Sequence, residues 1–202
     1  METIRGKTSR ELHLTELSEK LNGAEQVLLD LGTGDGHFAS RMAAQHRDWF
    51  VLGLDACREN LHKISRPNSA NLLFVIASAQ ELPCELAGLV SHVTVNFPWG
   101  SLLDCLLSGD PCLMDGLAAV SRPGASIEVR LNAGALMEAG TTLECGAEQI
   151  YDHAIRSGWQ VNAPVLMDRR APRTFPSTWA KRLAYGRDAR AMTISGKKCN
   201  VK

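Results

Sequence analysis

Short apolar runs alternate with amphipathic segments along most of the chain. The runs have the length and composition of buried strands, and they span residues 27–30, 49–55, 72–77, 92–97 and 126–131. The segments between them repeat apolar residues three or four positions apart, which predicts helices over residues 37–47, 57–65, 102–107, 111–121 and 146–157. Because strands and helices alternate, we expect parallel strands joined by right-handed crossovers, which gives a doubly wound α/β sheet.

The two ends of the chain lie outside this alternating pattern. Residues 1–21 predict a strand or hairpin followed by a helix, and residues 158–159 begin a sixth core strand. Residues 168–178 are rich in Pro and Arg and predict a long loop before a last strand. We therefore expect one domain, with an extension at 1–21, a core at 22–167 and a basic loop and last strand at 168–202. The predicted sheet is mostly parallel and seven-stranded, with an N-terminal β extension.

The composition is that of an ordinary soluble protein. Of the 202 residues, 45% are hydrophobic and 22% are charged. No apolar run approaches the roughly 18 residues of a membrane span, and the first ten residues contain no apolar secretion signal. The six cysteines are scattered without a C-x-x-C pair, which favours reduced thiols over disulfides or a metal site. We expect a cytoplasmic monomer that binds neither membranes nor metals.

The charge is unevenly distributed although the net charge is zero. Residues 169–202 contain ten basic residues and one acid, so this segment carries +9 and residues 1–168 carry −9. A basic segment of this kind is compatible with a solvated tail. It is also typical of a protein that binds an anionic polymer such as RNA. The charge alone leaves both interpretations open.

A glycine-rich turn follows the first strand of the core. Residues 30–36 read D-x-G-x-G-x-G, and these glycines let the backbone turn tightly and approach a ligand. A dinucleotide fingerprint would have its last glycine at His37, and Asp35 would place a carboxylate against a pyrophosphate. S-adenosylmethionine has no phosphate and carries a sulfonium and an ammonium, which suit the carboxylate of Asp30. The turn therefore favours S-adenosylmethionine over a dinucleotide.

Two later strand ends support the same cofactor. Asp55 ends the second strand, 20 residues after Asp35, where an acid accepts hydrogen bonds from both ribose hydroxyls. Residues 77–83 follow the third strand, where class I methyltransferases hold the adenine ring, and Gln80 is placed to bond the adenine edge. Together these features predict a class I, Rossmann-like methyltransferase. The cofactor candidates are Asp30, Gly32, Thr33, Gly34, Gly36, Asp55, Ala56, Ala79 and Gln80.

The fourth strand ends in Asn96-Phe97-Pro98-Trp99, at the edge that faces the transferred methyl group. An N-x-P-aromatic sequence at this place is typical of methyltransferases that modify base nitrogens. The turn brings a backbone carbonyl near the target nitrogen, and the aromatic ring supplies a stacking face. Asn96 and Trp99 are therefore candidate catalytic residues. The alternative is that Trp99 anchors the core beneath a proline turn.

A second aromatic candidate lies in the basic segment. Trp179 stands in the sequence Ser177-Thr178-Trp179-Ala180-Lys181-Arg182-Leu183. Basic residues interleaved with an aromatic ring are typical of sites for single-stranded or flipped bases. The alternative is a buried tryptophan beside Lys181 and Arg182.

Three stretches of the chain resemble the aminoglycoside-resistance methyltransferases that modify N1 of adenine 1408 in 16S rRNA. They are DLGTGDG (residues 30–36), FPWGSLL (residues 97–103) and SxWAKRLAYGR (residues 177–187), and the similarity covers most of the chain. The resemblance implies methylation of this adenine in the assembled 30S subunit, with S-adenosylmethionine as cofactor and aminoglycoside resistance as the result. It also implies that Trp99 and Trp179 sandwich the flipped adenine, while Ser177 helps to hold the loop carrying Trp179.

The resemblance implies roles for further residues. Arg66 matches a basic contact to the RNA backbone, and the basic positions of the C-terminal segment are Lys181, Arg182 and Arg187. Positions of the cofactor pocket are matched by Asp30, Gly32, Asp55 and Ser101. The chain departs from the family in two places. Residues 132–146 contain no Lys or Arg where family members grip the RNA, and Gln80 stands where an acid is expected.

The implied reaction needs no general base, because adenine N1 carries a free lone pair at neutral pH. Catalysis is then expected to consist of base flipping, positioning and desolvation. Three alternatives stay open: a methyltransferase of another RNA base such as tRNA guanine-N7, a small-molecule methyltransferase, and a catalytically silent RNA-binding relative. A cysteine nucleophile is not favoured, because neither Pro83-Cys84 nor Pro111-Cys112 lies at the end of the fourth strand.

Overall fold

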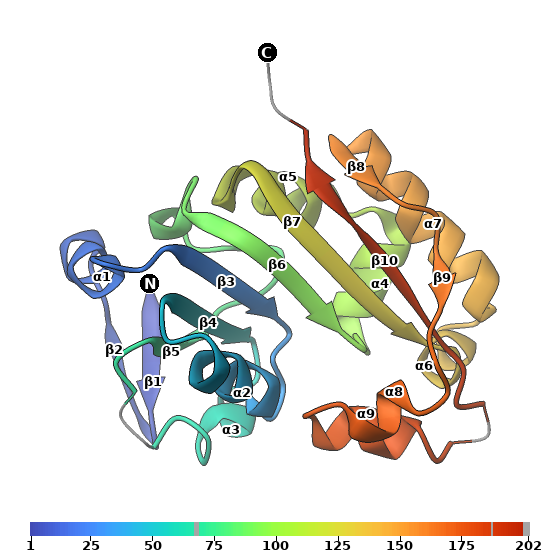
Figure 1. The fold of residues 1–202 in the computed structure, drawn as a ribbon, viewed down its shortest axis with the longest axis horizontal. Helices are drawn as coiled ribbons and strands as arrows, with labels where there is room; N and C mark the ends of the chain where they lie inside the picture. Colours follow the sequence, from blue (N-terminus) through green and yellow to red (C-terminus); the bar gives the residue numbers. More distant parts are fainter. Residues whose placement is uncertain (67–68, 187, 200–202) are drawn as a thin grey trace.

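One continuous sheet organises the computed structural model, which describes residues 1–66, 69–186 and 188–199 (Figure 1). The strands are β1 (Glu2–Arg5), β2 (Thr8–Glu11), β3 (Gln26–Leu31), β4 (Trp49–Asp55), β5 (Leu72–Ile76), β6 (Val90–Asn96), β7 (Ser121–Asn132), β8 (Trp159–Val161), β9 (Val165–Leu166) and β10 (Ala191–Lys198). Within the described part of the chain they lie in the order β2-β1-β5-β4-β3-β6-β7-β10-β8, and β9 pairs with β10.

The centre of the sheet is parallel, as the alternating sequence pattern predicts. β3 pairs in parallel with β4 and β6, and β5 and β7 continue the parallel sheet on either side. β10 then runs antiparallel between β7 and β8. These strands confirm the predicted mostly parallel, doubly wound α/β sheet. The predicted N-terminal extension is the hairpin β1–β2, which adds antiparallel to the edge at β5.

Helices cover both faces of the sheet. They are α1 (Leu14–Leu21), α2 (His37–Gln45), α3 (Arg58–Leu61), α4 (Ser101–Ser108), α5 (Pro111–Val120), α6 (Ala133–Glu138), α7 (Leu143–Arg156), α8 (Ala171–Thr174) and α9 (Thr178–Leu183). In β3, Leu29 and Leu31 share an apolar cluster with α1, α4, α5 and α7, whereas Leu28 shares one with α2, α3 and α9. Because strand side chains alternate between faces, a sheet covered on both sides requires the continuous apolar runs seen in the sequence.

Two segments differ from the prediction. The helix expected at residues 57–65 is shorter, since α3 ends at Leu61 and residues 62–65 continue as turns. The N–H and the hydroxyl of Ser65 both donate to the Leu61 carbonyl, and the hydroxyl accepts from the Gly6 N–H, which ties these turns to the β1–β2 hairpin. Residues 168–178, expected as a loop, contain α8 and lead into α9. Pro172 lies in the first turn of α8, where a proline removes no helical hydrogen bond.

The carboxyl ends of the parallel strands open at one edge of the sheet. Leu31 lies beside Leu54 and Val95 in neighbouring strands, so the turns after β3, β4 and β6 meet there. Figure 1 shows α8 and α9 below the arrowheads of β3, β6 and β7. Ligands of parallel α/β sheets bind at this edge. No helix in the described ranges is both long and apolar enough to cross a membrane.

Candidate active site

A cavity of about 630 Å³ opens where the parallel strands end. Volumes of this order are typical of small-molecule sites. The predicted residues that line it are Asp30, Gly32, Thr33, Gly34, Asp55, Ala56, Ala79, Gln80, Asn96, Trp99, Ser101, Ser177, Trp179 and Arg182. Gly36, Arg66 and Lys181 do not line it, and Arg187 lies outside the described residues. The cavity therefore combines the cofactor candidates with both aromatic candidates.

The glycine-rich turn wraps closely around the end of β3. Gly32 has φ +69°, and a side chain there would collide with Leu102 of α4. Gly36 has φ +67° and begins α2, with Ile64 and Phe74 filling the space that a side chain would need. Gly36 is thus a packing residue beneath the turn rather than a cavity residue. The glycines permit both the left-handed backbone and the close approach of α2, α4 and β5.

Asp30 is buried at the base of the cavity, with 1% of its surface exposed. Its Oδ2 accepts from the Thr33 hydroxyl at 2.5 Å, and its Oδ1 accepts from Thr94 at 3.0 Å and Asn96 Nδ2 at 2.8 Å. Burial raises the pKa of Asp30 to about 6, against the lowering effect of these hydrogen bonds. These three side-chain hydrogen bonds fix the orientation of the carboxylate. A cation bound nearby would lower its pKa and so favour the charged form.

Asp55 stabilises the glycine turn from the neighbouring strand. Its Oδ2 accepts from the Gly34 N–H at 2.7 Å, and its Oδ1 accepts from the Cys57 N–H at 2.8 Å. Gln80 lies further along the same edge and donates from Nε2 to Asp110 Oδ2 at 2.9 Å. Asp110 in turn caps α5 by accepting from the Leu113 N–H. Gln80 therefore has a partner within the protein, and its carbonyl oxygen remains available toward the cavity.

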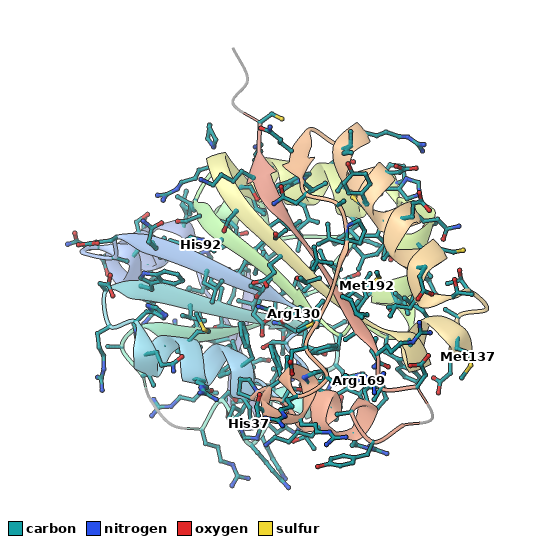
Figure 2. All side chains as sticks on the ribbon, turned by 45° about the vertical axis from the view of Figure 1, so that its right-hand side comes forward. His37, His92, Arg130, Met137, Arg169 and Met192 are labelled. Carbon is teal, nitrogen blue, oxygen red and sulfur yellow. The ribbon has the colours of Figure 1, made fainter. Side chains whose placement is uncertain are left out.

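Asn96 connects Asp30 to Arg130, a partly buried residue that the sequence did not reveal. The Oδ1 of Asn96 accepts from Arg130 Nη1 at 2.6 Å, while its Nδ2 donates to Asp30. Arg130 lies opposite Asn96 in β7, and its Nη2 also pairs with Glu128 at 2.6 Å. Figure 2 shows Arg130 between the sheet and the segment of α8 and α9. The oxygen and the nitrogen of the Asn96 amide thus each have a partner within the protein.

Trp99 projects outward at the rim of the cavity. Phe97 adopts φ +53° while its N–H donates to the Arg130 carbonyl at 2.8 Å, and this left-handed turn directs the chain away from the core. Trp99 is 57% exposed, and its Nε1 donates to Glu138 Oε2 at 2.8 Å. The alternative that Trp99 anchors the core is therefore wrong. The ring offers an accessible stacking face.

Trp179 faces Trp99 from α9. Ser177 caps this helix, its Oγ accepting from the Ala180 N–H at 3.4 Å. Trp179 is half-buried, and its indole Nε1 is buried without a hydrogen-bond partner among the described residues. The Arg182 guanidinium lies 5.6 Å from its ring centre. Both sequence interpretations thus hold in part: one side of the ring packs against the protein and the other lines the cavity.

The two indoles form a closed pair. Their centroids are 5.8 Å apart and their planes are inclined by 56°. A base stacked between two rings needs two contact layers, which requires about 7–8 Å between the rings. The rings must therefore separate and rotate before a base can lie between them.

The α8–α9 segment (residues 171–183) is attached to the sheet by Phe175. This ring stacks on Phe38 at 5.2 Å, meets Phe97 edge-on at 5.1 Å and lies 5.3 Å from the Arg130 guanidinium. Phe175 is buried, and it is the single aromatic residue of the Pro- and Arg-rich stretch that the sequence analysis read as a loop. An apolar aromatic residue in a polar, Pro-rich stretch is the sequence feature that indicates a buried contact here.

Of the described basic candidates, Arg182 lines the cavity, whereas Arg66 and Lys181 do not. Arg66 is exposed beside Gly6 in the β1–β2 turn, and Lys181 is exposed on α9. Arg182 reaches the cavity through its contact with Trp179. Among the described residues, no group of three or more His, Cys, Asp or Glu side chains is arranged to hold a metal ion.

Comparison with known proteins gives one consistent group. Residues 2–198 match the family model described as NpmA: 16S rRNA (adenine(1408)-N(1))-methyltransferase. A 16S rRNA (adenine(1408)-N(1))-methyltransferase of Streptoalloteichus tenebrarius is 32% identical over 93% of this chain and 94% of the relative. The solved 16S rRNA methyltransferase KamB is 30% identical, with a TM-score of 0.88 over 99% of this chain and 100% of that one. A mutant 16S rRNA (adenine(1408)-N(1))-methyltransferase from Catenulisporales acidiphilia, solved with cosubstrate SAM, is 26% identical, with a TM-score of 0.87 over 100% of this chain and 98% of that one.

Proposed function

The chain belongs to the 16S rRNA (adenine(1408)-N(1))-methyltransferase family, and from this premise we propose how its residues carry out the family's reaction. The reaction is S-adenosylmethionine-dependent methylation of N1 of adenine 1408 in 16S rRNA, which confers aminoglycoside resistance. The observation that carries the residue assignment is the meeting of Trp99 and Trp179 at the rim of the cavity whose base holds Asp30.

The strand ends have the donor and acceptor set that S-adenosylmethionine needs. Asp30 offers a buried negative charge to the cationic end, and Asp55 lies where the ribose hydroxyls bind. Gly32, Thr33, Gly34 and Ala56 let the backbone approach, while Ala79, Gln80 and Ser101 line the remaining wall. When bound, the cofactor supplies a methyl group that is already activated as a sulfonium. The protein's own task is therefore to bring the base nitrogen to that group.

Trp99 and Trp179 perform this task by stacking on the flipped adenine. Stacking on aromatic side chains is worth about 1–3 kcal/mol per base, which offsets part of the cost of flipping. The lone pair of N1 attacks without prior deprotonation, and positioning and exclusion of water provide most of the acceleration. The methylated ring is positively charged, so cation–π contact with two indoles stabilises the product-like transition state.

Asn96 and Ser177 act through structure rather than by proton transfer. Asn96 fixes Asp30 through its Nδ2. We expect a backbone carbonyl of the Asn96–Pro98 turn to accept from the amino group of the base. Ser177 caps α9 and so sets the orientation of Trp179. Neither side chain needs to touch the reacting nitrogen.

The basic side chains bind the substrate backbone. Arg66, Lys181, Arg182 and Arg187 are expected to contact phosphates of the assembled 30S subunit, since phosphate contacts position a protein on RNA. Residues 132–146 contain no Lys or Arg, so we expect these contacts to come from basic side chains outside that stretch. We expect the enzyme to act as a monomer in the cytoplasm, where the ribosomal subunits are.

The test is methyl transfer from labelled S-adenosylmethionine to purified 30S subunits, followed by primer extension. A stop at adenine 1408 in the wild type, lost when either Trp99→Ala or Trp179→Ala is introduced, supports the assignment. Full methylation by both variants would exclude the stacking roles. Transfer to tRNA or to small molecules in place of 30S would contradict the substrate, and cofactor binding without transfer to any RNA would indicate a silent relative.

A further inference from the structure

Asp35 of the glycine turn contacts the helix that carries Trp179. Its Oδ2 accepts from the backbone N–H of Thr178, the first residue of α9, at 2.6 Å. Its Oδ1 accepts from the N–H of His37, the first residue of α2, at 3.2 Å. One half-buried carboxylate therefore joins the cofactor turn to a helix 143 residues away in the sequence. A hydrogen bond between a carboxylate and a backbone N–H is charge-assisted and stronger than a neutral one.

Asp35 adds a polar contact to the apolar packing that holds α9. Phe175, three residues before Thr178, is fixed between Phe38, Phe97 and Arg130, and Ala180 of α9 is buried in the same apolar cluster. The bond to Asp35 is a directed contact at the first residue of α9, and Trp179 follows that residue directly in the chain.

We propose that Asp35 is a positioning residue for base stacking: it sets the place of Trp179 by holding α9 against the cofactor turn. This inference rests on the proposed stacking role of Trp179. The N–H of Gly34, the residue before Asp35, donates to Asp55. The glycine-rich turn therefore contacts both the proposed ribose site at Asp55 and the helix that carries Trp179.

The experiment is a double-mutant cycle with Asp35→Ala and Trp179→Ala, measured as kcat/KM for 30S subunits. Loss of one hydrogen bond to a charged group corresponds to about a 10- to 100-fold decrease for Asp35→Ala in the wild-type background. In the Trp179→Ala background the same change is expected to have less than about a threefold effect, because two residues that act through one another are not additive. The dissociation constant of S-adenosylmethionine is expected to stay within about threefold of wild type. The matched control is Asp48→Ala. Asp48 is an exposed aspartate directly before β4, at the end of that strand away from the cavity.

Hydrogen exchange gives a readout that needs no ribosomal substrate. Amides of residues 177–183 are expected to exchange faster in Asp35→Ala than in wild type or Asp48→Ala, with Asp35→Asn in between because its amide keeps one acceptor oxygen. If the 30S assay fails for wild type, the proposed function is wrong, and exchange alone then decides on Asp35. The proposal is overturned by unchanged exchange in α9, by equal effects of Asp35→Ala with and without Trp179, or by a loss of cofactor affinity as large as the loss of kcat/KM. If Asp35→Ala does not fold, the same comparisons are made with Asp35→Asn.

Discussion

Replacing Phe175 by Ala is expected to release the α8–α9 segment while leaving the sheet intact. The ring is 9% exposed, and removing a buried aromatic side chain of this kind costs about 3–5 kcal/mol. The contacts agree with that range. Two aromatic pairs, with Phe38 and Phe97, contribute about 0.5–1.5 kcal/mol each, and the Arg130 guanidinium adds about 0.5–2 kcal/mol.

The loss is expected to appear locally rather than in the global unfolding transition. The α8–α9 segment lies on one face of the sheet, and the main apolar core with β3, β6 and β7 lies on the other. Local opening of a segment is measured by amide hydrogen exchange. A decrease of 3 kcal/mol in the opening free energy corresponds to about a 150-fold faster exchange. Peptides covering residues 171–183 are therefore expected to lose protection, while peptides from β3 and β6 keep it.

The matched variant is Phe175→Leu, which keeps an apolar side chain but loses the aromatic and cation–π contacts. It is expected to lie between wild type and Phe175→Ala. The reasoning is refuted if Phe175→Ala lowers the melting temperature of the whole protein while exchange in residues 171–183 changes no more than elsewhere. It is equally refuted if methylation survives complete loss of protection in α9, since Trp179 would then not need its helix in place.

Three further predictions concern the cavity. Affinity for S-adenosylmethionine is expected to be constant above pH 7 and to fall below pH 6, by about tenfold at pH 5, because the pKa of Asp30 is raised to about 6 and its protonated form offers no negative charge. Titration calorimetry across this range tests the expectation, and an affinity that does not change with pH contradicts it. Trp99→Phe is expected to keep more activity than Trp99→Ala, which loses about 1–3 kcal/mol of stacking, as measured by kcat/KM on 30S subunits; equal losses would mean that stacking is not the role of the ring. Glu138→Ala is expected to reduce kcat/KM about two- to fivefold and Glu138→Gln less, because the exposed bond to the Trp99 indole is weak and the amide still accepts from it; a larger loss for Gln than for Ala would contradict this.

The cofactor half of the site follows from local sequence. Asp30, the glycines after it and Asp55 each stand at a strand end, and strand ends in a parallel sheet meet at one edge. The order of strands and helices along the chain is therefore enough to predict that these residues lie close together. The same logic yields the turn of Asn96 to Trp99, because β6 is the next strand beside β3.

The substrate half depends on contacts between distant segments. Nothing near Arg130 in the sequence indicates that it will lie beneath Phe175, and Glu138 meets Trp99 across 39 positions. The exposure of Trp99 is decided by the left-handed backbone of Phe97, a conformation that residue type does not predict. The reading of residues 168–178 as a loop fails for a related reason. Pro172 lies in the first turn of α8, where proline is tolerated, and Pro176 lies between the two helices. Phe175 offsets the entropy cost of ordering the segment by packing against three residues from other elements.

The spacing of the two tryptophans bears on how a base would enter. At 5.8 Å the indoles contact each other, so we expect a base to replace this contact when it binds. The two rings are held very differently. Trp179 is half-buried on a helix tied to the sheet at Phe175 and to the cofactor turn at Asp35. Trp99 is 57% exposed, and its indole is held by one hydrogen bond to an exposed glutamate. Besides the contact between the two indoles, movement of Trp99 breaks the bond to Glu138, whereas movement of Trp179 breaks the attachment of a helix. We therefore expect Trp179 to be the fixed ring against which an incoming adenine stacks, and Trp99 to be the ring that moves aside and closes over it.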